Sequence, residues 1–256
     1  MTNVDFGFRR KFRKYLILSF WLFIAKFILT IYVLSNTKYG QKLGNEIKNY
    51  FIDQSSELGF SLTNVKIQGQ NNIQAQYIIS VLNLDYGTPI FSINLVELRK
   101  LLEKNDWVKT AIVARKLPNN LYIGLVERKA IAIWQHNKNV DLIDDKGFAI
   151  KVKDIKPFKD LLYVVGEDAN LYAKSLIELL SSNPQLKSKV VSAIRYGQRR
   201  WDILLEDNIN VKLPEHNAAK AWAYIGKLDK EKKLFSENFT NIDLRDENRY
   251  YFSKKQ

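Results

Sequence analysis

The sequence predicts an α+β protein with three parts: a single N-terminal transmembrane helix, a small β-α-α-β-β module, and a mostly antiparallel β domain with helices. One apolar run, Tyr15–Leu34, predicts the transmembrane helix, because a helix needs roughly 20 residues to cross a bilayer. Two amphipathic helical patterns between strand-like segments predict the module, and short alternating segments separated by turn residues predict the β domain. We expect a basic segment at 1–14, the transmembrane helix at 15–34, a stalk at 35–58, the module at 59–128 and the β domain at 129–256.

Charge predicts the orientation of the transmembrane helix. The basic residues that precede it are Arg9, Arg10, Lys11, Arg13 and Lys14. Only Asp5 opposes them, and the charges that follow the helix are sparser. Clustered Lys and Arg close to a span resist translocation. We therefore expect a single-pass type II membrane protein with a cytoplasmic N-terminus and an exported body.

Lys26 divides the apolar run and leaves two questions open. The residues before it, Tyr15–Ala25, would suffice as the core of a cleaved signal peptide. Apolar residues continue after Lys26 and no small-x-small cleavage pattern follows, so an anchor is favoured. The Lys26 side chain either snorkels to the interface or contacts another transmembrane helix, and a single lysine favours snorkelling slightly.

Composition limits the possible partners. The formal net charge is +13, and the first 14 residues contribute +4 (five basic, one acidic), so +9 remains for the rest. The lysines of the body are dispersed, which indicates a solvated surface, and an exported body is on the wrong side of the membrane for nucleic acid. There are no cysteines, so the chain has no disulfide or thiolate chemistry.

The segment after the span begins with a polar stretch, Lys38–Glu57, whose loose apolar period (Leu43, Ile47, Phe51) predicts a helix or stalk rising from the membrane. The module that follows should begin with a half-buried strand and a helix that Asn72 caps. Its expected elements are the strand Leu62–Gln68, the helices Asn72–Leu82 and Leu95–Lys104, and the strands Val108–Leu117 and Leu121–Arg128.

The remaining half of the chain is mostly strand-like. Two amphipathic helical segments interrupt it, near Leu171–Leu180 and Ala218–Leu234. Three late strands separated by short turns predict an antiparallel meander. The expected strands are Ala130–His136, Val140–Ile143, Phe148–Val152, Leu161–Val165, Val190–Tyr196, Trp201–Leu205, Ile209–Leu213, Asn241–Arg245 and Arg249–Phe252.

A search of the sequence for catalytic motifs finds none. His136 and His216 are the only histidines and lack the acidic spacing of a metal site. There is no Gly-rich phosphate loop and no serine in a nucleophile-elbow setting. The pairs Glu127/Arg128 and Asp144/Asp145 lie at strand–turn boundaries, where we expect their charges to be solvated. The sequence therefore predicts no enzyme, no cofactor, no metal and no small-molecule substrate.

Several phrases, in this order, resemble the FtsQ/DivIB family of bacterial cell-division proteins. An opening strand and a junction resemble the family's POTRA module, and Leu142–Gly147 resembles its Leu-Val-Asp-x-x-Gly turn. The similarity covers nearly the whole chain. The phrases are Leu62–Gly69, Leu117–Leu121, Val126–Trp134, Leu142–Gly147, Arg200–Leu205 and Ile242–Arg245.

The resemblance implies a scaffold of the divisome, the division machinery, in the inner membrane at the septum. It implies FtsB-like and FtsL-like partners in the periplasm, contacts with other divisome membrane proteins, and a role in controlling septal peptidoglycan synthesis. In the family, a partner adds a strand near the C-terminus of the β domain. The matching positions here are Ile242, Asp243, Leu244, Arg245, Arg249, Tyr250, Tyr251 and Phe252.

The three aromatic residues Tyr250–Phe252 serve either as interface anchors or as core of their own domain, and alternation predicts that at least one packs inward. A secondary docking surface is expected on the module's first strand, at Val65, Lys66 and Ile67. An alternative function is a POTRA-containing component of polypeptide secretion or outer-membrane assembly. That alternative predicts tandem modules or a C-terminal transmembrane barrel, for which the chain is too short.

Overall fold

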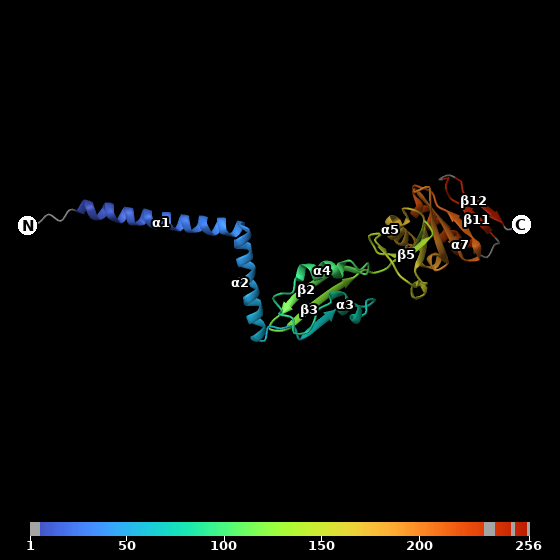
Figure 1. The fold of residues 1–256 in the computed structure, drawn as a ribbon. Coiled ribbons are helices and arrows are strands. Elements are labelled where there is room, and N and C mark those ends of the chain that lie inside the picture. Colours follow the sequence, from blue (N-terminus) through green and yellow to red (C-terminus); the bar gives the residue numbers. More distant parts are fainter. Residues whose placement is uncertain (1–5, 233–238, 247–248, 255–256) are drawn as a thin grey trace, which may run out of the picture. The chain divides into compact units, whose positions relative to one another are not determined.

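The computed structural model describes residues 6–232, 239–246 and 249–254. Figure 1 shows the elements coloured along the sequence. The chain divides into two compact units. One runs from the N-terminal helix to Ile67 and includes residues 82–98 and 112–123. The other comprises residues 68–81, residues 99–111 and everything from Gly124 onward. The predicted end of one helix, Leu234, lies outside the described residues.

The chain begins with two consecutive helices, α1 (Phe6–Asn36) and α2 (Lys38–Glu57). Among the described residues, α1 contains the one stretch long and apolar enough to cross a membrane, Tyr15–Leu34, and none of it is buried. Lys26 is exposed on this helix. Thr37 separates the two helices in an extended conformation (φ −89°, ψ 152°), and its hydroxyl accepts a hydrogen bond from the Gly40 N–H. Thr37 therefore ends one helix and caps the next.

The following module has the predicted order β-α-α-β-β. Its three strands form a sheet in the order β1-β3-β2. The boundaries of the strands and helices differ from the predicted ones by one to three residues, as is usual at element ends. The elements are β1 (Asn64–Gln68), α3 (Ala75–Leu82), α4 (Leu95–Glu103), β2 (Val108–Lys116) and β3 (Asn120–Glu127).

The predicted N-cap of the first module helix is wrong. Asn72 does not cap α3, which begins at Ala75. Instead, the backbone N–H groups of Asn71, Asn72 and Ile73 donate to the carboxylate of Glu127, at 2.8–3.2 Å. Glu127 ends β3, so a carboxylate from the far end of the module holds this turn in place.

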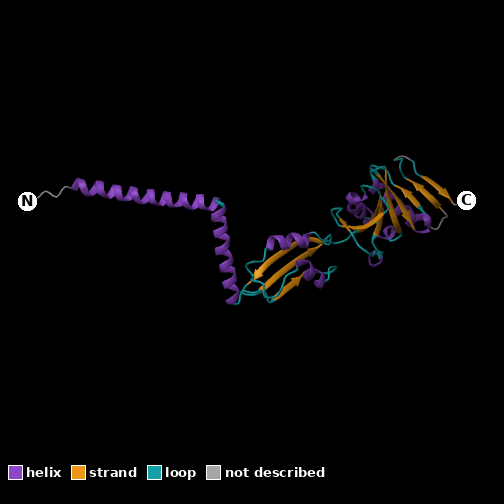
Figure 2. Cartoon of the chain, in the orientation of Figure 1, coloured by secondary structure: helices purple, strands orange, loops and turns teal. Residues whose placement is uncertain are grey.

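The C-terminal part is a nine-stranded sheet in the order β12-β11-β10-β9-β8-β7-β4-β5-β6. Figure 2 shows strands in orange and helices in purple. Its helices are α5 (Ala169–Ser181), α6 (Pro184–Lys187) and α7 (Ala218–Lys232), with short 3₁₀ turns at Lys156–Phe158 and Glu206–Asn208. The strands are β4 (Ala132–His136), β5 (Asn139–Ile143), β6 (Ala149–Ile150), β7 (Leu162–Val165), β8 (Val190–Tyr196), β9 (Arg200–Leu205), β10 (Asn210–Lys212), β11 (Phe239–Asp243) and β12 (Tyr251–Lys254).

The sheet is mixed, although most of its neighbouring pairs are antiparallel as predicted. The meander β8-β9-β10 is antiparallel throughout. The pairs β4–β7, β7–β8 and β10–β11 are parallel, which the sequence did not predict. Parallel neighbours need a crossover connection. Helices α5 and α6 lie between β7 and β8 in the chain, and α7 lies between β10 and β11.

The main core lies between one face of this sheet and helices α5 and α7. Leu176 and Leu180 of α5 pack with Trp222 and Ile225 of α7. Trp222 is fully buried, and its indole N–H donates to the Leu180 carbonyl at 3.3 Å. Both crossover helices therefore cover the same face, and their apolar sides meet the inward side chains of the strands. A smaller cluster around Ile133 fills the opposite face near β4 and β5.

A glycine contact gives the first prediction. Gly69 has φ +85°, and a Cβ there would lie 2.0 Å from the Leu125 carbonyl oxygen. Gly87 has nearly the same φ, +90°, and nothing within 4 Å of the corresponding position. Gly87→Ala should therefore cost about 1–2 kcal/mol of unfolding free energy from backbone strain alone. Gly69→Ala should cost at least about 1–3 kcal/mol more, because the backbone must also move.

Urea unfolding of the detergent-solubilised chain, followed by tryptophan fluorescence, measures both variants. Equal losses for Gly69→Ala and Gly87→Ala would contradict the close approach of Gly69 to Leu125.

The Glu127 carboxylate gives the second prediction. Burial raises the pKa of Glu127, but hydrogen bonds from the N–H groups of Asn71 and Asn72 outweigh it and hold that pKa below its ordinary value. The resulting stability is present above the unfolded-state pKa of about 4.3 and is lost as the pH falls through the folded-state value. Glu127→Gln should therefore lower the unfolding free energy by about 1–3 kcal/mol at pH 7.

The same variant should cost much less near pH 3, where the parent carboxylate is itself being protonated. Urea unfolding at both pH values tests this, with Glu97→Gln, on the exposed side of α4, as the control. A loss that is the same at both pH values would show that Glu127 acts through packing and not through its charge.

Candidate partner-binding edge

The last strand, β12, forms one edge of the nine-stranded sheet. On its inner side it pairs antiparallel with β11, Ile242 opposite Phe252 and Asp243 opposite Tyr251. No strand of the described chain pairs with its outer side. The opposite edge, β6, is only two residues long. An unpaired edge leaves alternate backbone N–H and C=O groups free to bind an added strand, and β12 is the longer template.

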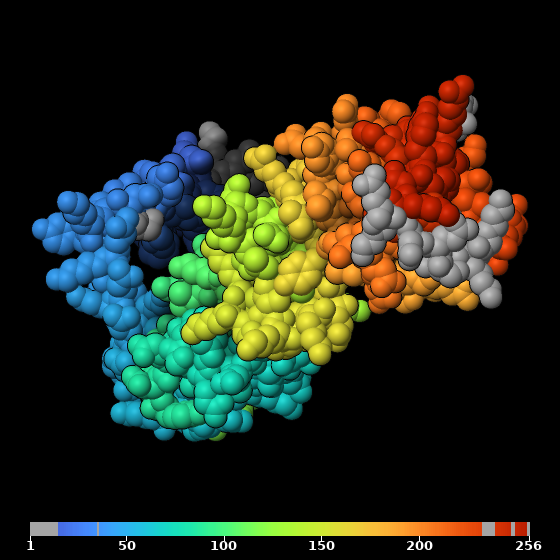
Figure 3. Space-filling view, turned by 90° about the vertical axis from the view of Figure 1, so that its right-hand side faces the viewer, coloured from blue at the N-terminus to red at the C-terminus, as the bar shows by residue number. Residues whose placement is uncertain are grey.

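The structure brings the predicted C-terminal site residues together on two adjacent strands. Ile242 and Asp243 end β11, and Leu244 and Arg245 follow directly. Arg249 and Tyr250 precede β12, which begins with Tyr251 and Phe252. Figure 3 shows these C-terminal strands, in red, at the surface of the molecule. The sequence did not distinguish the two strands; in the structure β11 is interior and β12 is the edge.

The apolar residues of β11 anchor this edge. Ile242 and Leu244 are fully buried in the main core, among residues of α5 and α7. The Leu244 N–H also donates to the Lys212 carbonyl, 3.0 Å away, which extends the pairing with β10. The side chains of Ile242 and Leu244 therefore pack inside this domain. A strand added to the sheet would pair with β12 and would not contact them directly.

The three aromatic residues have different surroundings. Tyr250 is half-buried against the main core, and its ring centroid lies 4.8 Å from that of Tyr224 on α7. This confirms the expectation that at least one of the three packs inward. Phe252 is 36% exposed and contacts Phe239 at 5.5 Å between ring centroids. Tyr251 is 55% exposed and, by strand alternation, faces the other side of the sheet.

A charged pair holds the chain where it leaves β11. The Arg245 guanidinium donates to both carboxylate oxygens of Asp243, with Nε at 2.9 Å from Oδ1 and an Nη nitrogen at 2.6 Å from Oδ2. These hydrogen bonds lower the pKa of Asp243, and burial only partly opposes them. The carboxylate in turn raises the pKa of Arg245. Both groups therefore stay charged at neutral pH and stiffen the end of the strand beside β12.

The expectation that Glu127/Arg128 and Asp144/Asp145 are merely solvated is wrong for three of these residues. Asp144 is 1% exposed and accepts hydrogen bonds from Arg128 at 2.8 Å and from the Lys146 and Phe148 N–H groups at 2.9 Å. Burial raises the pKa of Asp144, but these donors hold it below its usual value. Glu127 is similarly occupied by backbone donors. These carboxylates fasten turns, and no local sequence signal distinguishes them from exposed turn residues.

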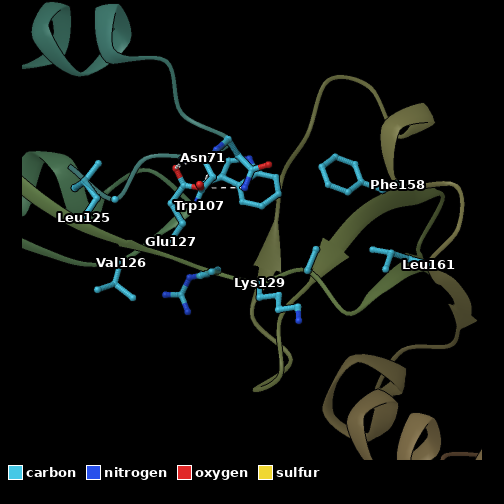
Figure 4. A pocket seen from close by; sticks show the side chains of 12 residues that line it. Asn71, Trp107, Leu125, Val126, Glu127, Lys129, Phe158 and Leu161 are labelled. Atoms are coloured by element: carbon cyan, nitrogen blue, oxygen red, sulfur yellow. Dashed lines mark hydrogen bonds between the residues drawn. The ribbon is translucent and has the colours of Figure 1, made fainter. Parts of the chain in front are cut away.

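A pocket of about 570 Å³ lies beside Glu127 (Figure 4). Its walls are mostly apolar, with Trp107 and Phe158 facing each other at 5.7 Å between ring centroids and Leu161 beyond them. Its charged lining residues are Glu127, Arg128 and Lys129, and the Glu127 carboxylate already accepts hydrogen bonds from the N–H groups of Asn71 and its neighbours. The described residues contain no group of three or more His, Asp or Glu side chains placed to hold a metal ion.

The remaining candidate residues lie apart from β12 in the sequence and in separate elements. Val65, Lys66 and Ile67 belong to β1, an edge strand of the three-stranded sheet, where Lys66 is exposed and its two neighbours are half-buried. Lys26 lies within α1. Neither position has a described contact that identifies a partner, so both remain predictions.

Comparison with known proteins identifies the family. Residues 60–128 match the model of the FtsQ-type POTRA domain, and residues 132–245 match that of the C-terminal domain of cell division protein FtsQ/DivIB. Together these matches span both predicted domains, which favours the division family over the secretion alternative. The extracytoplasmic domain of DivIB from Geobacillus stearothermophilus is also similar, at 13% identity and a TM-score of 0.29 over 42% of this chain and 96% of that one.

Three relatives are all described as cell division protein FtsQ. The protein of Rickettsia felis is 45% identical over 85% of this chain and 81% of its own length. That of Rickettsia bellii is 48% identical over 81% of this chain and 78% of its own, and that of Bartonella bacilliformis is 35% identical over 81% and 67%. With its apolar N-terminal helix, POTRA module and C-terminal sheet, the chain belongs to the FtsQ/DivIB family of single-pass membrane cell-division proteins.

Proposed function

We propose that this protein is a non-enzymatic scaffold of the divisome that links early and late division proteins at the septum. It binds FtsB-like and FtsL-like partners in the periplasm and so helps to control septal peptidoglycan synthesis. The observation that supports this proposal most directly is that, among the described residues, no strand pairs with the outer side of β12. The proposed scaffold acts through protein contacts and requires no cofactor.

Strand addition is the binding mode that fits this edge. Backbone hydrogen bonds would supply affinity, and side chains on either face of the added strand would supply specificity. Tyr251 and Phe252 offer one exposed aromatic contact on each face, and aromatic residues are common anchors of interfaces. The buried Ile242 and the Asp243–Arg245 pair keep β11 rigid, which reduces the entropy lost on binding.

The proposed orientation places the POTRA module and the sheet on the periplasmic side of the inner membrane. The clustered basic residues before the span keep the N-terminus in the cytoplasm. The C-terminal edge is then on the same side as the periplasmic partners that it is proposed to bind.

Adjacent proline variants test strand addition. Successive residues of a strand direct their N–H groups to opposite sides, so Tyr251→Pro and Phe252→Pro differ in which side loses its donor. The variant that loses an outward donor should keep its thermal transition and bind the FtsB-like partner about tenfold more weakly. Binding is measured by capture of purified partner on the immobilised full chain in detergent.

Tyr251→Lys should also weaken capture, whereas Tyr86→Lys, at an exposed aromatic residue far from the sheet edge in the sequence, should not. Unchanged capture by all three β12 variants would exclude this edge as the binding site. Failure of the parent chain to capture either partner would contradict the proposed partners themselves.

Cysteine labelling tests the orientation, because the natural chain has no cysteine. A membrane-impermeant maleimide should label Lys153→Cys, an exposed position after the span, in cells whose outer membrane alone has been opened. It should label Thr2→Cys only after the inner membrane is broken. The reverse pattern would overturn the proposed topology.

A further inference from the structure

Helix α2 carries an apolar face that the described structure leaves uncovered. At 3.6 residues per turn, all of its large apolar side chains except Ile52 fall on one side of the helix. Each of them is 50–85% exposed, and α2 contains no buried residue. The α2 apolar face consists of Tyr39, Leu43, Ile47, Tyr50 and Phe51.

A different side of α2 meets the chain that follows it. Ile52, Ser55 and Ser56 are half-buried near its C-terminal end. The Ser56 hydroxyl hydrogen-bonds that of Ser61, and the Phe60 N–H donates to the Ser55 carbonyl at 3.1 Å. The contacts that attach α2 to its own domain therefore leave the α2 apolar face free.

Continuity with the transmembrane helix indicates what covers this face. The apolar span ends at Leu34, α1 ends at Asn36, and α2 begins at Lys38. The first turn of α2 is therefore only a few residues from the end of the span, at the boundary between the bilayer and water. Thr37 interrupts the helix there with extended backbone, so α2 does not continue α1 as one helix.

The side chains of α2 match the chemistry of that boundary. Tyrosine is enriched at the level of the lipid headgroups, and the α2 apolar face has Tyr39 at one end and Tyr50 near the other. From Lys38 to Phe51 the helix carries three lysines against one glutamate, a net +2 that suits anionic headgroups. The acidic residues Asp53 and Glu57 come only after the last residue of the face.

The helix also needs a surface to be stable. It contains Gly40 and Gly44, and glycine inside a helix is destabilising. An isolated helix of 20 residues with this composition is marginal in water. A bilayer surface would bury the face along most of its length and stabilise it.

We propose that α2 lies along the outer surface of the bilayer, with the α2 apolar face in contact with lipid and its lysines among the headgroups. The helix is then an interfacial segment, and not the stalk rising from the membrane that the sequence suggested. This proposal rests on α1 spanning the membrane and is independent of any division partner.

Spin labels on the full-length chain test it. The absence of native cysteine allows single-cysteine variants, and Leu43→Cys and Ile47→Cys lie on the apolar face. The matched controls Asn45→Cys and Asn49→Cys are exposed on the opposite side of the same helix. The chains are placed in nanodiscs of phosphatidylethanolamine and phosphatidylglycerol, with one chain per disc.

Labels at 43 and 47 should collide several-fold more often with oxygen, which dissolves in lipid, than with a water-soluble nickel chelate. Labels at 45 and 49 should show the reverse. Equal access of the nickel chelate to all four positions would overturn the proposal, because the face would lie in water. Low access of both reagents at 43 and 47 would also overturn it, because the face would be buried in protein.

Two controls keep the result clear. Each variant should retain the thermal transition of the parent, and a variant that does not is excluded from the accessibility measurement because its chain is misfolded. In discs loaded with two chains, spin–spin broadening at 43 or 47 that replaces the oxygen access would assign the face to a second copy and overturn the lipid contact.

Discussion

The parallel pairing of β10 with β11 sets how the chain closes the C-terminal end of the large sheet. It requires the crossover helix α7, which fills the core with Trp222 and Ile225. It also buries Ile242 and Leu244 at the end of the chain. Because β10 occupies one side of β11, the last strand, β12, can pair only with the other side of β11. The position of β12 at the end of the described sheet is thus a consequence of how the core closes.

Three carboxylates stabilise turns or strand ends in this protein by accepting hydrogen bonds. Glu127 holds a turn in the POTRA module, Asp144 holds the turn between β5 and β6, and Asp243 holds the end of β11. In each case backbone N–H groups or an arginine keep the pKa low, so the charge persists at neutral pH. Stiffness of this kind suits a protein that works by presenting surfaces, because a pre-ordered edge loses less entropy on binding.

Local pattern was a good guide to the elements and a poor one to their long-range partners. The strand Val190–Tyr196 is predicted and found with the same limits, because β-branched and aromatic residues continue up to the turn that begins at Gly197. The prediction that Asn72 caps a helix is wrong because the Asn72 N–H donates to Glu127, 55 residues away. Asp144 was misjudged as solvated because its burial depends on Arg128, which belongs to another part of the fold.

The amino-acid sequence was enough to predict the membrane span, the order of the POTRA elements and the C-terminal segment where the candidate site lies. The first two depend on hydrophobic length and periodicity, which neighbouring residues carry, and the third follows from the resemblance to the family. The sequence did not predict that β12 and not β11 is the edge, that Leu244 is buried, or that Tyr251 is more exposed than Tyr250. These outcomes depend on which strands pair and which helices cover them, and hydrogen bonds between distant segments leave no local pattern in the sequence.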